Sequence, residues 1–293
     1  MAIDSTPRRS VLYMPGSNDR ALEKAKSLPA DSLILDLEDA VAPNAKTSAR
    51  EQVSAALAAG GYGPRELVIR VNALSTPWGY DDLVMAAQSH ANAILLPKVE
   101  SADAVTTAET IVQAFAGASM PAIWCMMETP RGILNAQAIA EASPHLKALV
   151  MGTSDLAKDL HCAHTPSRLP MLYALSHCLM AARAAGLSVI DGVHLDLNDD
   201  EGFREQCKQG RELGFDGKTL IHPKTIAAAN ELFAPDQAAI DWAKRVIEAH
   251  EAASARGEGV VLLDDKLIEN LHVVDAHRII ALTKLIAARQ HQV

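Results

Sequence analysis

Short apolar runs rich in Leu, Ile and Val alternate along this chain with longer Ala-rich stretches that are typical of helices. The runs lie at residues 10–14, 32–37, 67–71, 93–96, 122–127, 148–151, 188–190 and, more weakly, 217–220. Most of them are continuous rather than alternating, as expected for strands buried on both faces of a parallel sheet. Eight such strand–helix units predict an α/β fold, a (β/α)8 TIM barrel, over residues 1–233. A doubly wound open sheet is the structural alternative, but it usually has fewer strands for this length.

The last part of the chain, residues 234–293, does not fit a further strand–helix unit and predicts a C-terminal helical extension. Helices are expected from Pro235 to about Ala255 and again near 274–289, with a short apolar run at 260–263 between them. Such an extension can serve as a lid, as an oligomer contact, or as helices packed on the barrel wall.

Charge and cysteine content exclude several classes of protein. The formal net charge is −9, which argues against nucleic acid as a partner because a phosphate backbone needs a basic face. We find no run long and apolar enough to cross a membrane, and the first nine residues lack the apolar core of a signal peptide. The four cysteines form no C-x-x-C pair, so we expect reduced thiols in a cytoplasmic protein.

Charged residues follow the predicted strands at the ends where a barrel carries its chemistry. The carboxylates are Glu38, Asp39, Glu128 and Asp155, and the cations are Arg70 and Lys98. Neighbouring carboxylates repel each other unless a cation lies between them, and a set without His or Cys favours Mg²⁺ or Mn²⁺. Glu128 and Asp155 follow adjacent strands and are the expected metal ligands, with Glu38 and Asp39 beside them. The alternative is a ring of ion pairs that closes the barrel end.

The two cations have two interpretations each. Arg70 can hold a substrate carboxylate through two hydrogen bonds, or it can pair with Glu38 or Asp39, and both can hold together. Lys98 raises the alternative of a Schiff-base aldolase, although an ion-paired lysine is equally consistent with the pattern.

Basic and histidine residues also lie near the ends of the predicted strands. Arg20 and Lys24 lie four residues apart, and so do Lys46 and Arg50, which suits a phosphate-rich ligand unless these are simply solvated helix faces. His161 and His164 resemble a metal pair, but we expect loop residues because no third ligand lies nearby in the sequence. His194 and the acidic stretch at 196–201 are expected to form a solvated loop.

Several sequence motifs carry a resemblance to a known family. They are RSVLYMPG at 9–16, DLEDAV at 36–41, RVN at 70–72, LPKVE at 96–100, METPRG at 127–132, GTSD at 152–155, GFDGK at 214–218 and IHP at 221–223. In this order they resemble the HpcH/HpaI aldolase and citrate lyase β-subunit superfamily, specifically its CoA-ester lyases for citryl-, malyl- and citramalyl-CoA.

The resemblance implies roles for individual residues. Glu128 and Asp155 would bind Mg²⁺, and Arg70 would bind the carboxylate of the substrate. The residues expected to contact substrate or CoA are Tyr13, Arg20, Lys24, Lys46, Arg50, Ile221 and His222. The resemblance also implies a homotrimer or a dimer of trimers. A C-terminal segment of such lyases supplies a catalytic aspartate, and here Glu269 stands at that position as the candidate acid/base.

The resemblance therefore predicts a Mg²⁺-dependent carbon–carbon lyase that converts a hydroxy-acyl-CoA thioester into an acyl-CoA and an α-keto acid. Three alternatives stay open at this point. Two are enzymes of the same superfamily, a malyl-CoA thioesterase and a pyruvate aldolase that uses no CoA. The third is a non-catalytic subunit of a larger lyase complex.

Overall fold

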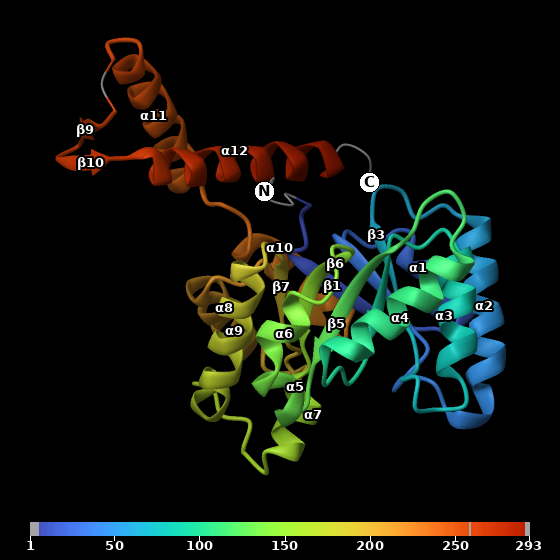
Figure 1. Cartoon of the computed structure of the whole chain (residues 1–293). Coiled ribbons are helices and arrows are strands. Elements are labelled where there is room, and N and C mark those ends of the chain that lie inside the picture. Colours follow the sequence, from blue (N-terminus) through green and yellow to red (C-terminus); the bar gives the residue numbers. More distant parts are fainter. Residues whose placement is uncertain (1–5, 258, 291–293) are drawn as a thin grey trace. The chain divides into compact units, whose positions relative to one another are not determined.

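The structure is a computed structural model that describes residues 6–257 and 259–290, so part of the N-terminal segment discussed above lies outside the described residues. Its centre is a closed barrel of parallel strands in sequence order, with β1 paired to β8 (Figure 1). The strands are β1 (Ser10–Pro15), β2 (Ser32–Asp36), β3 (Glu66–Arg70), β4 (Ala93–Leu96), β5 (Ala122–Met127), β6 (Leu146–Met151), β7 (Ser188–Asp191) and β8 (Gly217–Leu220). The predicted (β/α)8 barrel is confirmed, and the open sheet is excluded because the sheet closes on itself.

Helices connect successive strands and form the outer layer (Figure 1). They are α1 (Asp19–Ala25), α2 (Lys46–Ala59), α3 (Gly79–Gln88), α4 (Ala102–Phe115), α5 (Pro130–Leu134), α6 (Ala136–Ala140), α7 (Thr153–Asp159), α8 (Leu172–Ala184), α9 (Asp200–Leu213) and α10 (Ile226–Leu232), with 3-10 turns η1 (Pro43–Ala45), η2 (Leu169–Met171) and η3 (Pro223–Thr225). Asn18 caps α1 by accepting a hydrogen bond from the Ala21 amide, and α2 ends at Gly60, whose φ of 66° favours glycine. Both helix boundaries follow from these local signals.

Buried aliphatic side chains fill the barrel. One cluster comes from the strands alone and includes Val11, Ile34, Val68, Leu95, Trp124, Val150 and Ile190. A larger cluster lies between the strands and the surrounding helices. Since the interior is packed, a ligand has room only at the strand ends and in the loops that follow them.

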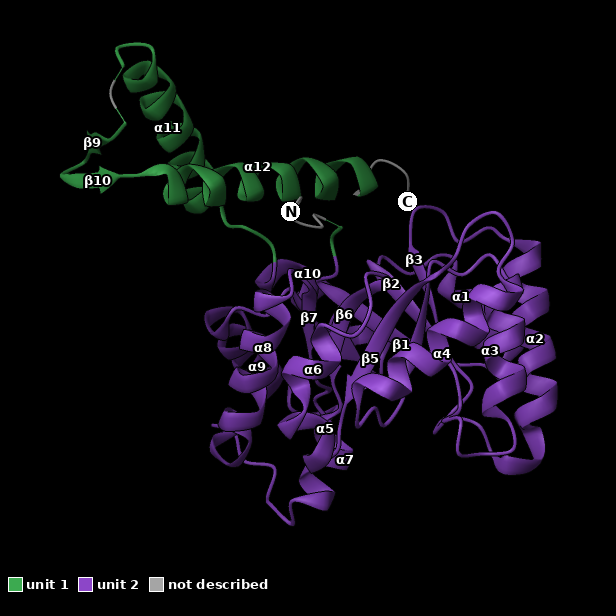
Figure 2. Cartoon of the chain, viewed as in Figure 1, with its two compact units in different colours: residues 1–7, 234–293 green, residues 8–233 purple. Residues whose placement is uncertain are grey.

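The chain divides into two compact units, one over residues 8–233 and one formed by the remaining residues (Figure 2). The second unit contains α11 (Gln237–Ser254), a hairpin of β9 (Val261–Leu263) and β10 (Lys266–Ile268), and α12 (Asn270–Gln290). It has its own small core, built from Ala243, Val246, Ile268, Val273 and Ala276. None of the helices in the described ranges is long and apolar enough to cross a membrane.

Two details of the second unit differ from the sequence-based expectation. The apolar run near 260–263 pairs with a second strand, β10, which was not predicted. The hairpin turn places Asp264 and Asp265 at φ of 49° and 59°. The sequences Asn-Gly and Asp-Gly usually predict such a turn, whereas Asp-Asp does not. In addition, α12 begins at Asn270 rather than near 274.

Candidate active site at the carboxyl ends of the barrel strands

Arg70 and Asp36 form the centre of a charged cluster at the strand ends. They are the last residues of β3 and β2 and lie opposite each other in the parallel register. Arg70 Nε donates to Asp36 Oδ1 at 2.7 Å and Nη2 donates to Oδ2 at 2.6 Å, while Nη1 lies 3.0 Å from Glu38 Oε2. Both partners are buried. The expected ion pair of Arg70 with Glu38 is present, but the stronger partner, Asp36, was not predicted.

Asp36 also orders the loop after β2. Its oxygens accept hydrogen bonds from the amides of Glu38 and Ala40 at 2.9 and 3.1 Å. The ammonium of Lys46 donates to the carbonyls of Leu37 and Glu38 at 2.8 and 2.6 Å. Lys46 is buried, and burial lowers its pKa. In this structure Lys46 therefore fixes the loop that carries Glu38 instead of facing solvent.

Lys98 follows β4 and touches three carboxylates of the cluster. Its backbone amide donates to Glu128 Oε1 at 2.7 Å, and its Nζ lies 2.5 Å from Glu38 Oε1 and 3.3 Å from Asp155 Oδ2. Burial opposes the charge, but the hydrogen bond to Glu38 and the charge of Glu128 outweigh it and raise the pKa of Lys98 above its ordinary value. A Schiff-base lysine must lose its proton, so this environment favours the ion-paired interpretation.

Glu128 and Asp155 occupy neighbouring strand ends. Glu128 follows β5, and Asp155 lies in the first turn of α7, which follows β6. Burial, and then the charge of Glu38, raises the pKa of Glu128 to about 7. Gly152 packs directly against Glu128, because a Cβ added there would lie 2.4 Å from Glu128 Cβ and 2.7 Å from its Oε2. Glycine thus lets the β6–α7 turn approach the buried carboxylate.

The donor set of this cluster fits a hard divalent cation. Five carboxylates surround two cations: Asp36, Glu38, Asp39, Glu128 and Asp155 against Arg70 and Lys98. Burial is the main reason that the pKa of Glu128 is raised, and the charge of Glu38 adds to it, while Lys98 and Arg70 act in the opposite direction. Mg²⁺ commonly takes one or two protein carboxylates and leaves its other positions to water and substrate. Within the described ranges, no group of three or more His, Cys, Asp and Glu side chains is arranged so that it could hold a metal ion.

The predicted substrate-contacting residues around the cluster differ in exposure. The Tyr13 ring lies under Arg70, with 4.8 Å between the guanidinium carbon and the ring centroid. Ile221 and His222 follow β8, the neighbour of β1, and both are exposed. His222 Nδ1 accepts a hydrogen bond from the Lys224 amide at 3.1 Å. An aromatic face and an exposed apolar residue thus flank the charged cluster.

The four basic helix residues separate into two kinds. Arg20 and Lys24 on α1 are exposed, and neither forms an ion pair within residues 6–257 and 259–290. Arg50, like Lys46, is engaged by the protein, since its Nε donates to Asp82 Oδ1 at 2.7 Å and Nη1 lies 3.2 Å from Asp81 Oδ2. Arg20 and Lys24 are therefore the two that remain available to a phosphate group.

Glu269, the predicted acid/base residue, does not belong to the unit of residues 8–233 that carries the charged cluster. Glu269 belongs to the second compact unit, where it lies between β10 and α12 and is exposed. Its backbone amide donates to His272 Nδ1 at 3.0 Å. His161 is also an exposed loop residue, with φ of 53°.

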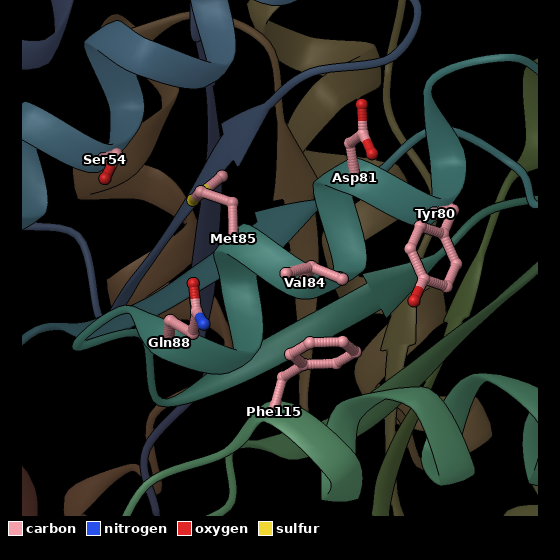
Figure 3. Close-up of a pocket in the computed structure, with 7 residues that line it drawn as sticks. All are labelled: Ser54, Tyr80, Asp81, Val84, Met85, Gln88 and Phe115. Carbon is pink, nitrogen blue, oxygen red and sulfur yellow. The ribbon is translucent and has the colours of Figure 1, made fainter.

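A pocket of about 360 Å³ lies on the outer wall of the barrel (Figure 3). Its lining comes from α2, α3 and α4: Ser54, Tyr80, Asp81, Val84, Met85, Gln88 and Phe115. None of the strand-end residues described above lines it. This pocket is therefore separate from the charged cluster.

Comparison with known proteins gives one family. A family model for HpcH/HpaI aldolase/citrate lyase matches residues 9–223. The chain is 48% identical over 288 residues to a protein of Cereibacter sphaeroides named (3S)-malyl-CoA thioesterase, covering 98% of this chain and 99% of that one. It is 37% identical over 278 residues to citrate lyase subunit beta of Escherichia coli, covering 93% and 92% of the two chains.

Solved structures give the same result. The protein CitE of Mycobacterium tuberculosis, in complex with magnesium, acetoacetate and coenzyme A, superimposes with a TM-score of 0.75 at 28% identity, covering 96% of this chain and 99% of that one. The citrate lyase beta subunit of the same organism, with oxaloacetate and magnesium, gives a TM-score of 0.68 at 29% identity and covers 79% of this chain and 99% of that one.

Proposed function

Because the chain belongs to the HpcH/HpaI aldolase/citrate lyase family, we propose that it is a Mg²⁺-dependent carbon–carbon lyase for a hydroxy-acyl-CoA thioester of the citryl-, malyl- or citramalyl-CoA type. The products are an acyl-CoA and an α-keto acid. The observation that carries this proposal is the grouping of Glu128, Asp155 and Arg70 around one mouth of the barrel. Relatives bound to magnesium together with oxaloacetate or with acetoacetate and coenzyme A support the same ligands here.

Glu128 and Asp155 hold the Mg²⁺ ion in this proposal, and Mn²⁺ suits the same oxygen donors. When bound, the ion acts as a Lewis acid toward the oxygens of the substrate. Glu38 and Asp39 lie in the surrounding shell, where Glu38 contacts both Arg70 and Lys98. Asp39 is more exposed and lies 3.5 Å from Arg70 Nη1.

Arg70 binds the carboxylate of the substrate and offsets negative charge that develops during cleavage. Its guanidinium is already oriented by Asp36 and by the Tyr13 ring, so little reorganisation is needed when the substrate arrives. In the cleavage direction a base removes the proton of the substrate hydroxyl, the carbon–carbon bond breaks, and its electron pair forms the enolate of the acyl-CoA. Protonation of that enolate completes the reaction, and Glu269 is the proposed acid/base group.

The CoA portion needs a cationic partner for its phosphates. Arg20 and Lys24 are exposed on α1, the helix that follows the strand carrying Tyr13. We place the phosphates of the thioester near these two residues because their charge is not consumed by an ion pair within the described ranges. Ile221 and His222 flank β1 on its other side.

Hydrolysis of the thioester is the second candidate function. The 48% identity to a protein named (3S)-malyl-CoA thioesterase, over nearly the full length of both chains, favours it. The recognition of the hydroxy-acid end is the same in both reactions. The two differ in whether the carbon–carbon bond breaks or water attacks the thioester carbonyl.

The deciding experiment incubates the purified chain alone with malyl-, citramalyl- and citryl-CoA and Mg²⁺, and measures both the keto acid and free CoA thiol. A lyase releases keto acid without thiol, whereas a thioesterase releases thiol without keto acid. A CoA-independent pyruvate aldolase would turn over none of these thioesters and would act on free hydroxy-keto acids instead. Inactivity on every substrate would favour a subunit of a larger complex, as the name of the Escherichia coli relative suggests.

Two further measurements accompany this panel. Glu128→Ala is expected to abolish turnover that depends on added metal, and full activity under chelation would refute the metal role. Light scattering tests the assembly that we propose, a homotrimer or a dimer of trimers.

A further inference from the structure

We propose that Lys98 is a displaceable internal counter-ion: without metal its ammonium lies between Glu38 and Asp155, and it gives up Asp155 when a divalent cation binds. The inference rests on the proposed metal site of Glu128 and Asp155, and it assigns to Lys98 control over the affinity of that site.

The backbone of Lys98 ties it to one proposed metal ligand. Its amide donates to Glu128 Oε1 at 2.7 Å, and its φ of 49° is a conformation that a lysine rarely adopts. Such a conformation persists only where the surroundings enforce it, and here it points the amide at a buried carboxylate. The side chain of Lys98 therefore starts from a fixed point beside Glu128.

The ammonium of the same residue reaches the other proposed ligand. Its Nζ is 3.3 Å from Asp155 Oδ2, so Lys98 contacts Glu128 through the amide and Asp155 through the side chain. An ammonium at this place supplies one positive charge to the carboxylates that a divalent cation would otherwise neutralise. A cation that binds Asp155 must compete with this ion pair.

The contacts of Nζ are unequal, which makes displacement possible without unfolding the loop. Glu38 Oε1 is 2.5 Å away and belongs to a largely buried side chain that Arg70 also holds. Asp155 is 3.3 Å away and 31% exposed, while Asp39 is 3.9 Å away and 59% exposed. Lys98 can keep Glu38, leave Asp155 and move toward Asp39 by rotating its flexible chain.

Titration with Mn²⁺ followed by electron paramagnetic resonance measures free ion directly and needs no turnover. Lys98→Met is expected to bind Mn²⁺ about tenfold more tightly than the wild type, because removal of a competing charge a few ångströms away is worth about that much. The metal-free variant should also melt at a lower temperature, since Asp155 loses its cation and Glu38 keeps only Arg70. Lys98→Gln, which retains a hydrogen-bond donor for Glu38, provides the same test if the methionine variant folds poorly.

Lys158→Met is the matched control. Lys158 lies on α7, the helix that carries Asp155, but its side chain is 79% exposed and its ion pair with Asp159 is 4.0 Å long. This control variant also removes one lysine charge, here from the helix that carries Asp155, without touching the cluster, so Mn²⁺ affinity should not change. Unchanged or weaker Mn²⁺ binding by both Lys98 variants would overturn the inference. Failure of the wild type to bind Mn²⁺ would instead refute the proposed metal site.

Discussion

Arg70 and Asp36 end neighbouring strands in register, and two parallel hydrogen bonds of 2.7 and 2.6 Å join the guanidinium to the carboxylate. The pair is buried, and the remaining Nη1 of Arg70 points toward Glu38. Because the barrel register places both residues at one mouth, the fold itself orients the cation that we assign to substrate binding.

Replacing Arg70 with lysine tests this assignment. Lysine keeps the charge but cannot make two parallel hydrogen bonds, so kcat/KM should fall by about 10²–10³-fold while the protein remains folded. Steady-state kinetics and circular dichroism check the two parts. Arg204→Lys is the control, because Arg204 lies on α9 in an exposed pair with Glu231. If Arg70→Lys retained the kcat/KM of the wild type, Arg70 would serve only in a structural ion pair.

Most strand positions were predictable because most of the buried strands are continuous apolar runs, whereas β8, with Lys218 and Thr219, gives a weaker signal. The charged residues after the strands were predictable for the same reason, since Glu38, Glu128 and Asp155 lie in the segments that follow such runs. A single sequence does not reveal which of these charged residues bond to one another. The register that opposes Asp36 to Arg70, and the left-handed backbone that aims the Lys98 amide at Glu128, depend on how strands close into a barrel. Lys46 and Arg50 were predicted ligand contacts, yet they bond to the protein itself.

Glu128→Gln should change how stability depends on pH. The pKa of Glu128 in the folded, metal-free protein is about 7, above the ordinary value of a glutamate, and burial is the main cause. The folded state therefore holds this proton more tightly, and the stability that it contributes is present below about pH 4.3 and lost as the pH rises through 7. Between pH 5 and pH 8 the wild type should lose roughly 2–3 kcal/mol through this group.

Urea denaturation in the presence of a chelator measures this loss. Glu128→Gln has no carboxyl group to ionise, so its free energy of unfolding should fall less over the same range and exceed that of the wild type at pH 8. Glu231→Gln, at an exposed ion pair, should follow the wild type. Parallel curves for wild type and Glu128→Gln would contradict the raised pKa.

Asp191→Asn should destabilise the barrel without touching the charged cluster. Asp191 is fully buried at the end of β7, where it accepts hydrogen bonds from Arg168 Nη1 at 2.7 Å and Lys218 Nζ at 3.0 Å. The substitution leaves two buried cations without their anion, at a cost of about 3–5 kcal/mol. Chemical denaturation should show this loss, while Glu231→Gln should change stability by less than about 1 kcal/mol. If Asp191→Asn lost as little free energy of unfolding as the control, water would have to reach Asp191, Arg168 and Lys218.

The double variant Arg20→Ala, Lys24→Ala tests phosphate binding. Its KM for a hydroxy-acyl-CoA should rise by about tenfold or more and become less sensitive to salt, with kcat nearly unchanged, since only binding of the remote phosphates is lost. The corresponding pantetheine thioester lacks these phosphates, so wild type and variant should show equal KM values for it. Lys208→Ala on α9 provides a control for an exposed lysine elsewhere on the surface. An equal rise in KM for both thioesters would contradict phosphate binding at α1.

Substitutions of Glu269 distinguish an effect on proton transfer from an effect on binding. It is exposed beside the β9–β10 hairpin, so substitutions there should leave folding intact. Glu269→Gln retains size and polarity but cannot exchange a proton, and kcat should fall by about 10²–10⁴-fold with Mn²⁺ affinity unchanged. Glu269→Asp restores the carboxylate one methylene shorter, so activity should return in part, limited by positioning errors of about 1 Å.

Asp275→Asn on α12, which removes an exposed carboxylate paired with Arg278, is the control and should retain wild-type kcat. If Glu269→Gln turned over as fast as this control, Glu269 would not be the acid/base group.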